Sequence, residues 1–386
     1  MDYTKRDFLK AAAILVADAI AGTRLSGLTG RRGASPNQKV ILVISGGIRH
    51  AESFSPDGVV HIPHLSGDLL QRAILYPRVL NEGVTGHFNS TSSILTGNWQ
   101  RVDDWGKFPP TTPTIFESLR KQLHVAHSDV WMISSNKALT NHIGASSAPS
   151  YGPAYGANVV FPKQLLVSTV ENAVWEGHNR NLADRSQMQA EIEAILQGSN
   201  YEGLGWNVFD AAEQLDPQVR STIMDAVAEY VAGGPTSGDE LTYHVSVGVM
   251  RKFAPALLVV SFSDVEVAHF GSYSLHLAGI HSFDRLVYEL WQEVESNRSY
   301  KGQTTMIVLP EFGRDPDGSS TNGFFNHRSQ DDSCRATWMM CLGAAVDRPQ
   351  IVERPVRHID VCPTLAALLG CKQTDVLGSR LTELRA

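Results

Sequence analysis

The sequence has few charged residues, few cysteines and no basic runs, heptads, fixed-period repeats or low-complexity tracts. Charged residues make up 19% of its 386 residues, and 33 Lys and Arg stand against 40 Asp and Glu, which gives a formal net charge of −7. A nucleic-acid-binding protein needs a basic face that neutralises phosphates, so this acidic balance argues against a nucleic-acid partner. Hydrophobic residues reach 42%, which is enough for a large core and excludes general disorder. One large α/β-type domain remains.

The four cysteines lie near the C-terminal end and have no Cys-x-x-Cys spacing. Cys362 and Cys371 would bracket one short helix, and an oxidising compartment would permit a disulfide bond between them. Cys341 lies in an apolar run, so we expect it to be a buried small hydrophobic residue. The spacing leaves the pairing of the cysteines open.

The N-terminal apolar stretch is too short to span a bilayer as a mature helix. It covers residues 11–21, follows a basic pair, contains Asp18 and ends in small residues, which is the pattern of a signal peptide. Residues 4–10 resemble the twin-arginine export motif, with lysine in place of the first arginine. We predict a signal peptide over residues 1–21, a linker over residues 22–38, a periplasmic or secreted protein, and no stable membrane span after cleavage. An amphipathic N-terminal helix of the domain is the alternative.

Apolar runs and helical patterns alternate along the rest of the chain. Runs typical of buried parallel strands lie at residues 39–45, 129–134, 256–262, 304–309 and 336–342. Helix-like stretches lie at residues 114–122, 163–175, 185–196, 217–231 and 275–296. This alternation predicts a three-layer α/β/α sandwich with a mostly parallel central sheet over residues 39–386. Residues 140–250 are expected to form a helical insertion or cap over the sheet edge.

Polar side chains follow three of the predicted strands directly. These clusters are Arg49, His50 and Glu52; Asp264, Glu266 and His269; and Glu311, Arg314 and Asp315. His327 follows a glycine-rich loop further on. Parallel sheets bind ligands beyond the carboxyl ends of their strands, so these side chains are candidates for one site. Asp264, His269 and His327 would supply one oxygen and two nitrogens, a ligand set suited to zinc or a similar ion.

Four segments then carry a family resemblance in their expected order. They are residues 81–84 with 93–97, residues 264–269 with Asp284, residues 305–313, and residues 357–365. They are similar to the nucleophile loop, the Asp-x-x-Gly-His metal motif, the strand ending in Ser-Asp-His-Gly and a late strand-to-helix turn of the alkaline phosphatase superfamily. That group includes sulfatases, nucleotide pyrophosphatases and phosphodiesterases. The resemblance implies an α/β/α fold and metal-dependent hydrolysis of a phosphate or sulfate ester.

The chain departs from the family pattern at the metal centre. Ser45-Gly46-Gly47 stand where the family has a metal-binding Asp, His87 falls on the position of the nucleophile, and Glu311-Phe312 replace Asp-His. One of the two usual metal positions has therefore lost most of its ligands. For the rebuilt centre we predict that four side chains converge in one metal-sized site: Asp264, His269, Glu311 and His327.

The first interpretation is a hydrolase in which metal-activated water attacks a small anionic ester. The metal is predicted to be zinc, with manganese and calcium as alternatives. His87 would be a ligand or general base and Glu52 a further ligand. Arg314 would clamp the anion, or would instead pair with Asp315 and Asp317 at the surface.

Two further interpretations stay open. In one, Ser90 or Thr91 is a displaced nucleophile at a helix start, although residues 89–91 more simply form a helix N-cap. In the other, catalysis is lost and the chain is a periplasmic binding or interaction protein. Asp284 would orient a ligand histidine or would be a helix-surface carboxylate. Stoichiometric metal that is lost on His269→Ala would favour the enzyme.

Overall fold

The computed structural model describes residues 36, 38–136, 138, 139, 141–163, 222, 225, 237–318 and 323–386. The predicted signal peptide at residues 1–21 lies outside the described residues, as do most of the linker at residues 22–38 and most of the insertion at residues 140–250. The helices predicted at residues 163–175, 185–196 and 217–231 fall almost entirely outside as well. Within the described residues, no helix combines the length and apolar character needed to cross a membrane.

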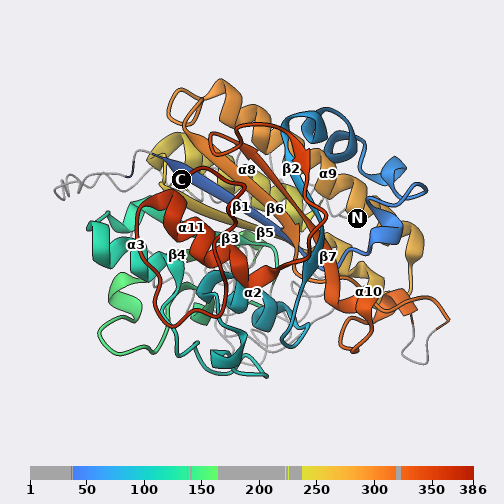
Figure 1. Ribbon diagram of the computed structural model, residues 1–386, viewed down its shortest axis with the longest axis horizontal. Helices are drawn as coiled ribbons and strands as arrows, with labels where there is room; N and C mark the ends of the chain where they lie inside the picture. The colour runs from blue at the N-terminus through green and yellow to red at the C-terminus, as the bar shows by residue number, and fades with distance from the viewer. Residues whose placement is uncertain are drawn as a thin grey trace, which may run out of the picture.

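One central sheet organises the described part of the chain (Figure 1). Its nine described strands are β1 (Lys39–Ser45), β2 (Ile74–Leu80), β3 (Val130–Ser134), β4 (Asn158–Val160), β5 (Leu257–Phe262), β6 (Thr304–Pro310), β7 (Ala336–Gly343), β8 (Gln350–Ile351) and β9 (Val356–Arg357). Their order is β4-β3-β5-β1-β6-β7-β2-β8, and β9 pairs with β2. β7 runs antiparallel to β6 and β2, and the other described pairings are parallel. The prediction of a mostly parallel sheet is confirmed.

Helices cover both faces of this sheet (Figure 1). α8 (Gly238–Phe253) and α9 (Tyr273–Ser296) pack on one face, and α2 (His87–Thr96), α3 (Ile115–Leu123) and α11 (Val361–Leu369) pack on the other. The shorter helices are η1 (His50–Glu52), η2 (Val59–His61), η3 (Leu65–Leu69), η4 (Leu70–Arg72), η5 (Trp99–Arg101), η6 (His127–Asp129), η7 (Asn141–Gly144), η8 (Pro153–Tyr155), η9 (Asp264–Phe270), η10 (Gly323–Phe325), α10 (Asp332–Arg335) and η11 (His358–Asp360). The three-layer α/β/α prediction is therefore confirmed.

β1 lies in the middle of the sheet, and all seven of its residues are buried. Ile41 and Val43 enter the core beneath α8 and α9, whereas Leu42 and Ile44 enter the core beneath α2, α3 and α11. A strand that is covered on both faces needs apolar side chains on both, because successive side chains alternate between the faces. This explains why β1 is a continuous apolar run in the sequence.

The sequence analysis missed β2, which lies near the far edge of the sheet. Pro77 interrupts its apolar pattern, and the pairing with β7 shifts register between Tyr76 and Val79. Proline has no N–H for the ladder, and a bulge accommodates it. β2 matters for function because its direction carries it to the same edge of the sheet as the carboxyl ends of β1, β5 and β6.

The four cysteines are buried and form no disulfide bond. Cys341 is fully buried in β7, which confirms the prediction of a small core residue. Cys362 is the second residue of α11, and Cys371 lies just beyond the end of that helix. The Cys362 thiol donates to the Leu95 carbonyl oxygen at 3.3 Å.

Candidate metal centre

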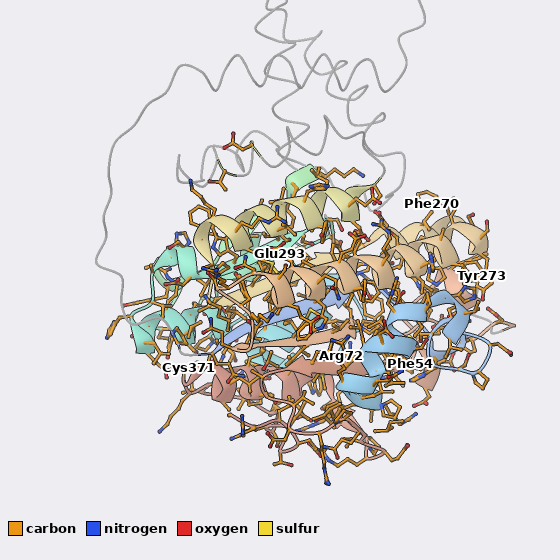
Figure 2. The ribbon with its side chains drawn as sticks, turned by 90° about the horizontal axis from the view of Figure 1, so that it is seen from above. Phe54, Arg72, Phe270, Tyr273, Glu293 and Cys371 are labelled. Carbon is orange, nitrogen blue, oxygen red and sulfur yellow. The ribbon has the colours of Figure 1, made fainter. Side chains whose placement is uncertain are left out.

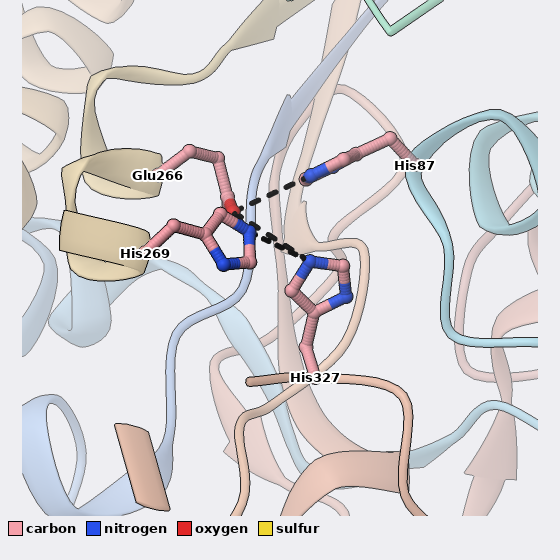
Figure 3. A group of neighbouring side chains, drawn as sticks. All are labelled: His87, Glu266, His269 and His327. Atoms are coloured by element: carbon pink, nitrogen blue, oxygen red, sulfur yellow. Dashed lines mark hydrogen bonds and ion pairs between the residues drawn. The ribbon is translucent and has the colours of Figure 1, made fainter. Parts of the chain in front are cut away.

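Four side chains meet at the carboxyl edge of the sheet (Figure 3), namely His87, Glu266, His269 and His327. His87 is the first residue of α2, Glu266 and His269 lie in η9 directly after β5, and His327 follows η10. Each residue offers one ligand atom, and these atoms all lie within 4.8 Å of one another. Three imidazoles and one carboxylate from distant parts of the sequence therefore converge at one point.

The distances within this group fit a single small metal ion. Glu266 Oε2 lies 3.1 Å from His269 Nε2, 3.3 Å from His87 Nε2 and 3.8 Å from His327 Nε2. The Nε2 atoms of His269 and His327 are 3.0 Å apart. A tetrahedral zinc ion with bonds of about 2.0–2.1 Å holds neighbouring ligand atoms roughly 3.3 Å apart. Both the ligand types and their spacing suit zinc.

The local helix type decides which residues after β5 join the group. η9 is a 3-10 helix, in which residues three apart lie on the same side. Glu266 and His269 are three residues apart and face each other, whereas Asp264 is five residues before His269. The sequence analysis placed Glu266 at the strand end but did not assign it as a ligand. The three-residue spacing was the signal that would have identified it.

Asp264, which we predicted as a metal ligand, is not brought into the group. Its Oδ2 accepts a hydrogen bond from the backbone N–H of Asp239 at 3.3 Å. Asp239 in turn accepts from the backbone N–H groups of Ser263 at 2.8 Å and Asp264 at 3.0 Å. Each carboxylate thus meets the N-terminus of the other residue's helix, where N–H groups lack partners within the helix. This position gives Asp264 a structural role at the junction of η9 and α8.

Glu311, also predicted as a ligand, lies behind His87 instead. Its Oε2 is 2.6 Å from His87 Nδ1, and its Oε1 accepts a hydrogen bond from the Thr91 hydroxyl at 2.6 Å. Glu311 therefore contacts the outer nitrogen of His87, and its oxygens are not among the converging ligand atoms. A carboxylate on the outer ring nitrogen fixes the tautomer and orientation of a metal-binding histidine, so this contact leaves His87 Nε2 to face the group.

His327 is oriented in a similar way by the backbone. Its Nδ1 lies 2.6 Å from the Thr85 carbonyl oxygen, which can only accept, so Nδ1 carries the proton and Nε2 carries the lone pair. The ring also stacks on Phe312, with ring centroids 4.3 Å apart and planes 13° apart. Phe312 cannot bind a metal, but it holds a residue of the group in place.

Glycines at the end of β1 make room for Glu266. A Cβ atom on Gly46 would lie 2.1 Å from Glu266 Oε1, and the Gly47 N–H donates to that same oxygen at 2.8 Å. The carboxylate of Glu266 therefore occupies the space that a side chain at position 46 would fill. The glycines of Ser45-Gly46-Gly47 therefore leave room for an acidic side chain that comes from η9.

Arg314, predicted to clamp an anion, is fully buried and contacts Glu266. Its Nη2 lies 2.6 Å from Glu266 Oε2, its Nε donates to the Gly47 carbonyl oxygen at 2.8 Å, and its Nη1 donates to the Phe324 carbonyl oxygen at 3.2 Å. The guanidinium therefore holds Glu266 in position. The surface pairing with Asp315 and Asp317 does not involve Arg314: Asp317 pairs with Arg49 at 3.0 Å. A contact between Arg314 and a substrate stays a prediction.

The electrostatics of the group favour the charge states that metal binding needs at two of the four residues. Burial disfavours a charged Glu266, but Arg314 and His87 outweigh it and hold the pKa of Glu266 well below its usual value. Burial, with the charge of His87, holds the pKa of His327 well below its usual value. Burial also opposes charge on His87, but Glu266 and Glu311 outweigh it and raise its pKa well above the usual value. A metal would therefore have to displace a proton from His87.

The remaining predicted residues have other partners. Glu52 is buried and pairs with Arg49 outside the group. Asp284 accepts from the backbone N–H groups of His64 at 3.0 Å and Leu65 at 2.7 Å and does not orient a ligand histidine. The hydroxyl of Ser90 accepts from the Asn81 amide at 2.7 Å. The N-cap of α2 is Gly86, so residues 89–91 lie inside the helix.

The fold of this chain is similar to those of several solved structures. No protein-family model and no curated protein matches the chain. Among solved structures, the phosphonate monoester hydrolase of Agrobacterium radiobacter is similar over 90% of this chain and 77% of its own, at 13% identity and a TM-score of 0.55. A Vibrio parahaemolyticus protein in the alkaline phosphatase superfamily is similar over 100% of this chain and 80% of its own, at 13% identity and a TM-score of 0.52. Wild-type alkaline phosphatase PafA is similar over 92% of this chain and 99% of its own, at 10% identity and a TM-score of 0.52.

Proposed function

Because the chain has the fold of the alkaline phosphatase superfamily, we propose that it is an exported, metal-dependent hydrolase of phosphate or sulfate esters with one rebuilt metal centre. The observation that carries the proposal is the convergence of His87, Glu266, His269 and His327 at the carboxyl edge of the sheet. Export rests on the pattern of residues 1–21, and secretion of a reporter fused to this segment tests it. Fold alone does not establish activity, so the chemistry is argued from the site.

Zinc is the metal we propose. Imidazole nitrogens suit zinc, whereas calcium prefers six to eight oxygen ligands, and this group has three nitrogens and one oxygen. When bound, a divalent ion would polarise the ester and lower the pKa of a water molecule. His87, Glu266, His269 and His327 would hold it.

The residues around the group have distinct tasks in this mechanism. Glu311 keeps the outer nitrogen of His87 engaged, so we assign His87 as a ligand and not as the general base. Arg314 and the Gly47 N–H hold the two oxygens of Glu266. Thr91 donates its hydroxyl proton to Glu311 and is fully buried, which makes water the better candidate for the nucleophile.

Arg328 is the cation we propose for contact with the substrate anion. It follows His327, is exposed, and its Nη2 lies 3.4 Å from the position of a Cβ on Gly86, which precedes His87. No hydrogen bond or ion pair engages it among the residues that the structure describes. A guanidinium presents five N–H donors in a fork that matches phosphate or sulfate oxygens. Arg314, in contrast, already has three partners.

Elemental analysis of the mature protein, purified without chelator, tests the centre. We expect about one equivalent of zinc per chain, lost in His269→Ala and in Glu266→Gln, because a site with fewer ligands binds metal weakly. His281→Ala is the matched control, since His281 is an exposed histidine on α9. Hydrolysis of 4-nitrophenyl phosphate and 4-nitrophenyl sulfate is measured on the same samples, with Arg328→Ala and Arg314→Lys compared for their effect on KM.

Three outcomes separate the interpretations. Metal and hydrolysis that disappear together in both site variants support the hydrolase. Metal without hydrolysis of any ester contradicts the proposed activity. A chain that takes up no metal on titration contradicts the centre, and the alternative of a catalytically inactive binding or interaction protein then gains weight.

A further inference from the structure

The four side chains of the metal group differ in their exposure to solvent. The side chain of His269 is 25% exposed, whereas those of His87 and His327 are 2% exposed and that of Glu266 is 7% exposed. Of the four side chains, that of His269 is thus the most accessible to water. A substrate would approach the group past His269, and the residues beside it would contact the part of the substrate that is not transferred.

Exposed aromatic residues lie close to His269 and His327 along the chain. Phe270 follows His269 directly and is 51% exposed, Tyr273 begins α9 and is 41% exposed, and Phe325, two residues before His327, is 37% exposed. Figure 2 labels Phe270 and Tyr273 at the same end of the molecule. Phe324 contacts two of these rings: its centroid is 5.0 Å from that of Tyr273 and 4.4 Å from that of Phe325. We call these four residues the aromatic rim.

The rim is continuous with the metal group through the backbone. A Cβ on Gly271 would lie 3.1 Å from Phe325 Cζ, so η9 and η10 press together where the rim forms. The Phe324 carbonyl oxygen accepts from Arg314, which also holds Glu266. The same two segments, residues 264–271 and 323–327, therefore supply three of the four ligands and three of the four rim residues.

The hydroxyl of Tyr273, the polar atom carried by the side chains of the rim, is already paired. The Tyr273 hydroxyl donates to Glu52 Oε1 at 3.2 Å, and Glu52 pairs with Arg49. Arg49 is shared further with the carboxylate of Asp317 and the carbonyl oxygen of Asp315. A sugar hydroxyl at the rim would need partners that these contacts occupy, whereas an apolar group only has to leave water.

We propose that the aromatic rim binds the apolar portion of the ester, so that the substrates are phosphate or sulfate esters of alkyl or aryl alcohols. This inference rests on the proposed function, and it adds the class of leaving group. Each methylene that leaves water at the rim is worth up to about fourfold in affinity.

A chain-length series of n-alkyl phosphates tests the rim, because ethyl, butyl, hexyl and octyl phosphate share their reactive group and differ in apolar surface. Binding is measured by calorimetry and turnover by phosphate release, both below the micelle concentration. We expect affinity and kcat/KM to rise with each methylene in the wild type. The double variant Phe270→Ser/Phe325→Ser should lose most of this rise, so its kcat/KM should fall further below that of wild type with each methylene added from ethyl to octyl phosphate. Trp105→Ser is the control, since Trp105 is 76% exposed outside the rim.

The results separate the two proposals. The rim is supported if affinity and kcat/KM increase with chain length in wild type and in Trp105→Ser but not in the double variant. Turnover without any dependence on chain length overturns the rim and leaves the hydrolase standing. Binding that strengthens with chain length and needs the rim, with no turnover, overturns the hydrolase and keeps the rim. A rise that survives in the double variant places apolar binding elsewhere and overturns the rim.

Discussion

In the proposed metal centre, Glu266 and Glu311 would have two separate tasks. Glu266 lies within the four-residue group, held by Arg314 and the Gly47 N–H. Glu311 lies behind His87 and accepts from Thr91. A ligand and the carboxylate that orients a ligand contribute differently to metal affinity, since losing the orienting group weakens the site without removing a bond to the metal.

Replacement of Glu311 by glutamine should separate these roles. Glu311→Gln keeps the shape but removes the charge that faces His87 Nδ1, so zinc affinity should fall about 10–100-fold. Competition with a chromophoric chelator measures it, with Glu289→Gln on α9 as the control. Complete loss of metal, as in His269→Ala, would make Glu311 a ligand, and an unchanged affinity would remove it from the centre.

Replacement of Gly46 by alanine should displace Glu266 without replacing any of the four proposed ligands. The new Cβ would lie 2.1 Å from Glu266 Oε1, which forces the carboxylate to move. We expect zinc affinity to fall at least about tenfold, by analogy with other changes next to a ligand. Gly67→Ala is the matched control, because no atom lies within 4 Å of a Cβ there. Unchanged zinc binding in Gly46→Ala would mean that Glu266 is not a ligand.

At the scale of elements, buried carboxylates join segments that are far apart in the sequence. Glu117 in the first turn of α3 accepts from the backbone N–H groups of Thr114 at 2.7 Å, Ser146 at 3.0 Å and Gly152 at 2.6 Å. The first contact belongs to a capping box, and the other two attach the loop at residues 144–156 to α3. This loop belongs to the predicted insertion at residues 140–250.

Removal of the Glu117 carboxylate should therefore cost more than the loss of a helix cap. Glu117→Ala leaves several buried N–H groups without acceptors, and we expect the free energy of unfolding to fall by about 3–5 kcal/mol. Glu295→Ala removes a surface ion pair with Arg72 and should cost less than about 1 kcal/mol. Urea unfolding of both variants measures the difference. Equal effects would show that the Glu117 network adds little stability.

At the scale of the whole molecule, two buried neutral histidines make stability depend on pH. Burial lowers the pKa of His276 to about 4, with a contribution from Arg314, and burial lowers the pKa of His358 to about 4. Unfolded histidine has a pKa of about 6.5, so between these values the unfolded chain binds protons that the folded chain does not. The contribution of each residue is full above pH ~6.5 and is lost as the pH falls toward ~4.

We expect each histidine to remove about 3 kcal/mol of unfolding free energy between pH ~7 and ~4. Urea unfolding across this range, with chelator present, measures the loss. His358→Gln keeps a neutral donor for the Leu80 carbonyl oxygen and should reduce the loss, whereas His281→Gln at the surface should not. A pH dependence that His358→Gln leaves unchanged would contradict this account.

Most strands of the sheet, and two residues of the candidate site, could be predicted from the sequence. The apolar runs of β1, β3, β5, β6 and β7 are local patterns, because a strand covered on both faces must be apolar along its whole length. The rule that ligands bind beyond strand ends drew attention to His269 and His327, which the structure brings into one group. β2 was missed because a bulge at Pro77 breaks that local pattern.

Only the tertiary structure shows which carboxylate after β5 joins the three histidines. Asp264 and Glu266 are both acidic residues after β5, and the 3-10 form of η9 turns Glu266 toward the histidines while Asp264 pairs with the N-terminus of α8. The space for Glu266 exists because Gly46, more than two hundred residues earlier, has no side chain. The sequence by itself determined the layers of the fold and the sheet edge at which chemistry is placed, since hydrophobic periodicity is local. Which side chains share a point at that edge depends on packing between distant segments, and only the folded chain decides it.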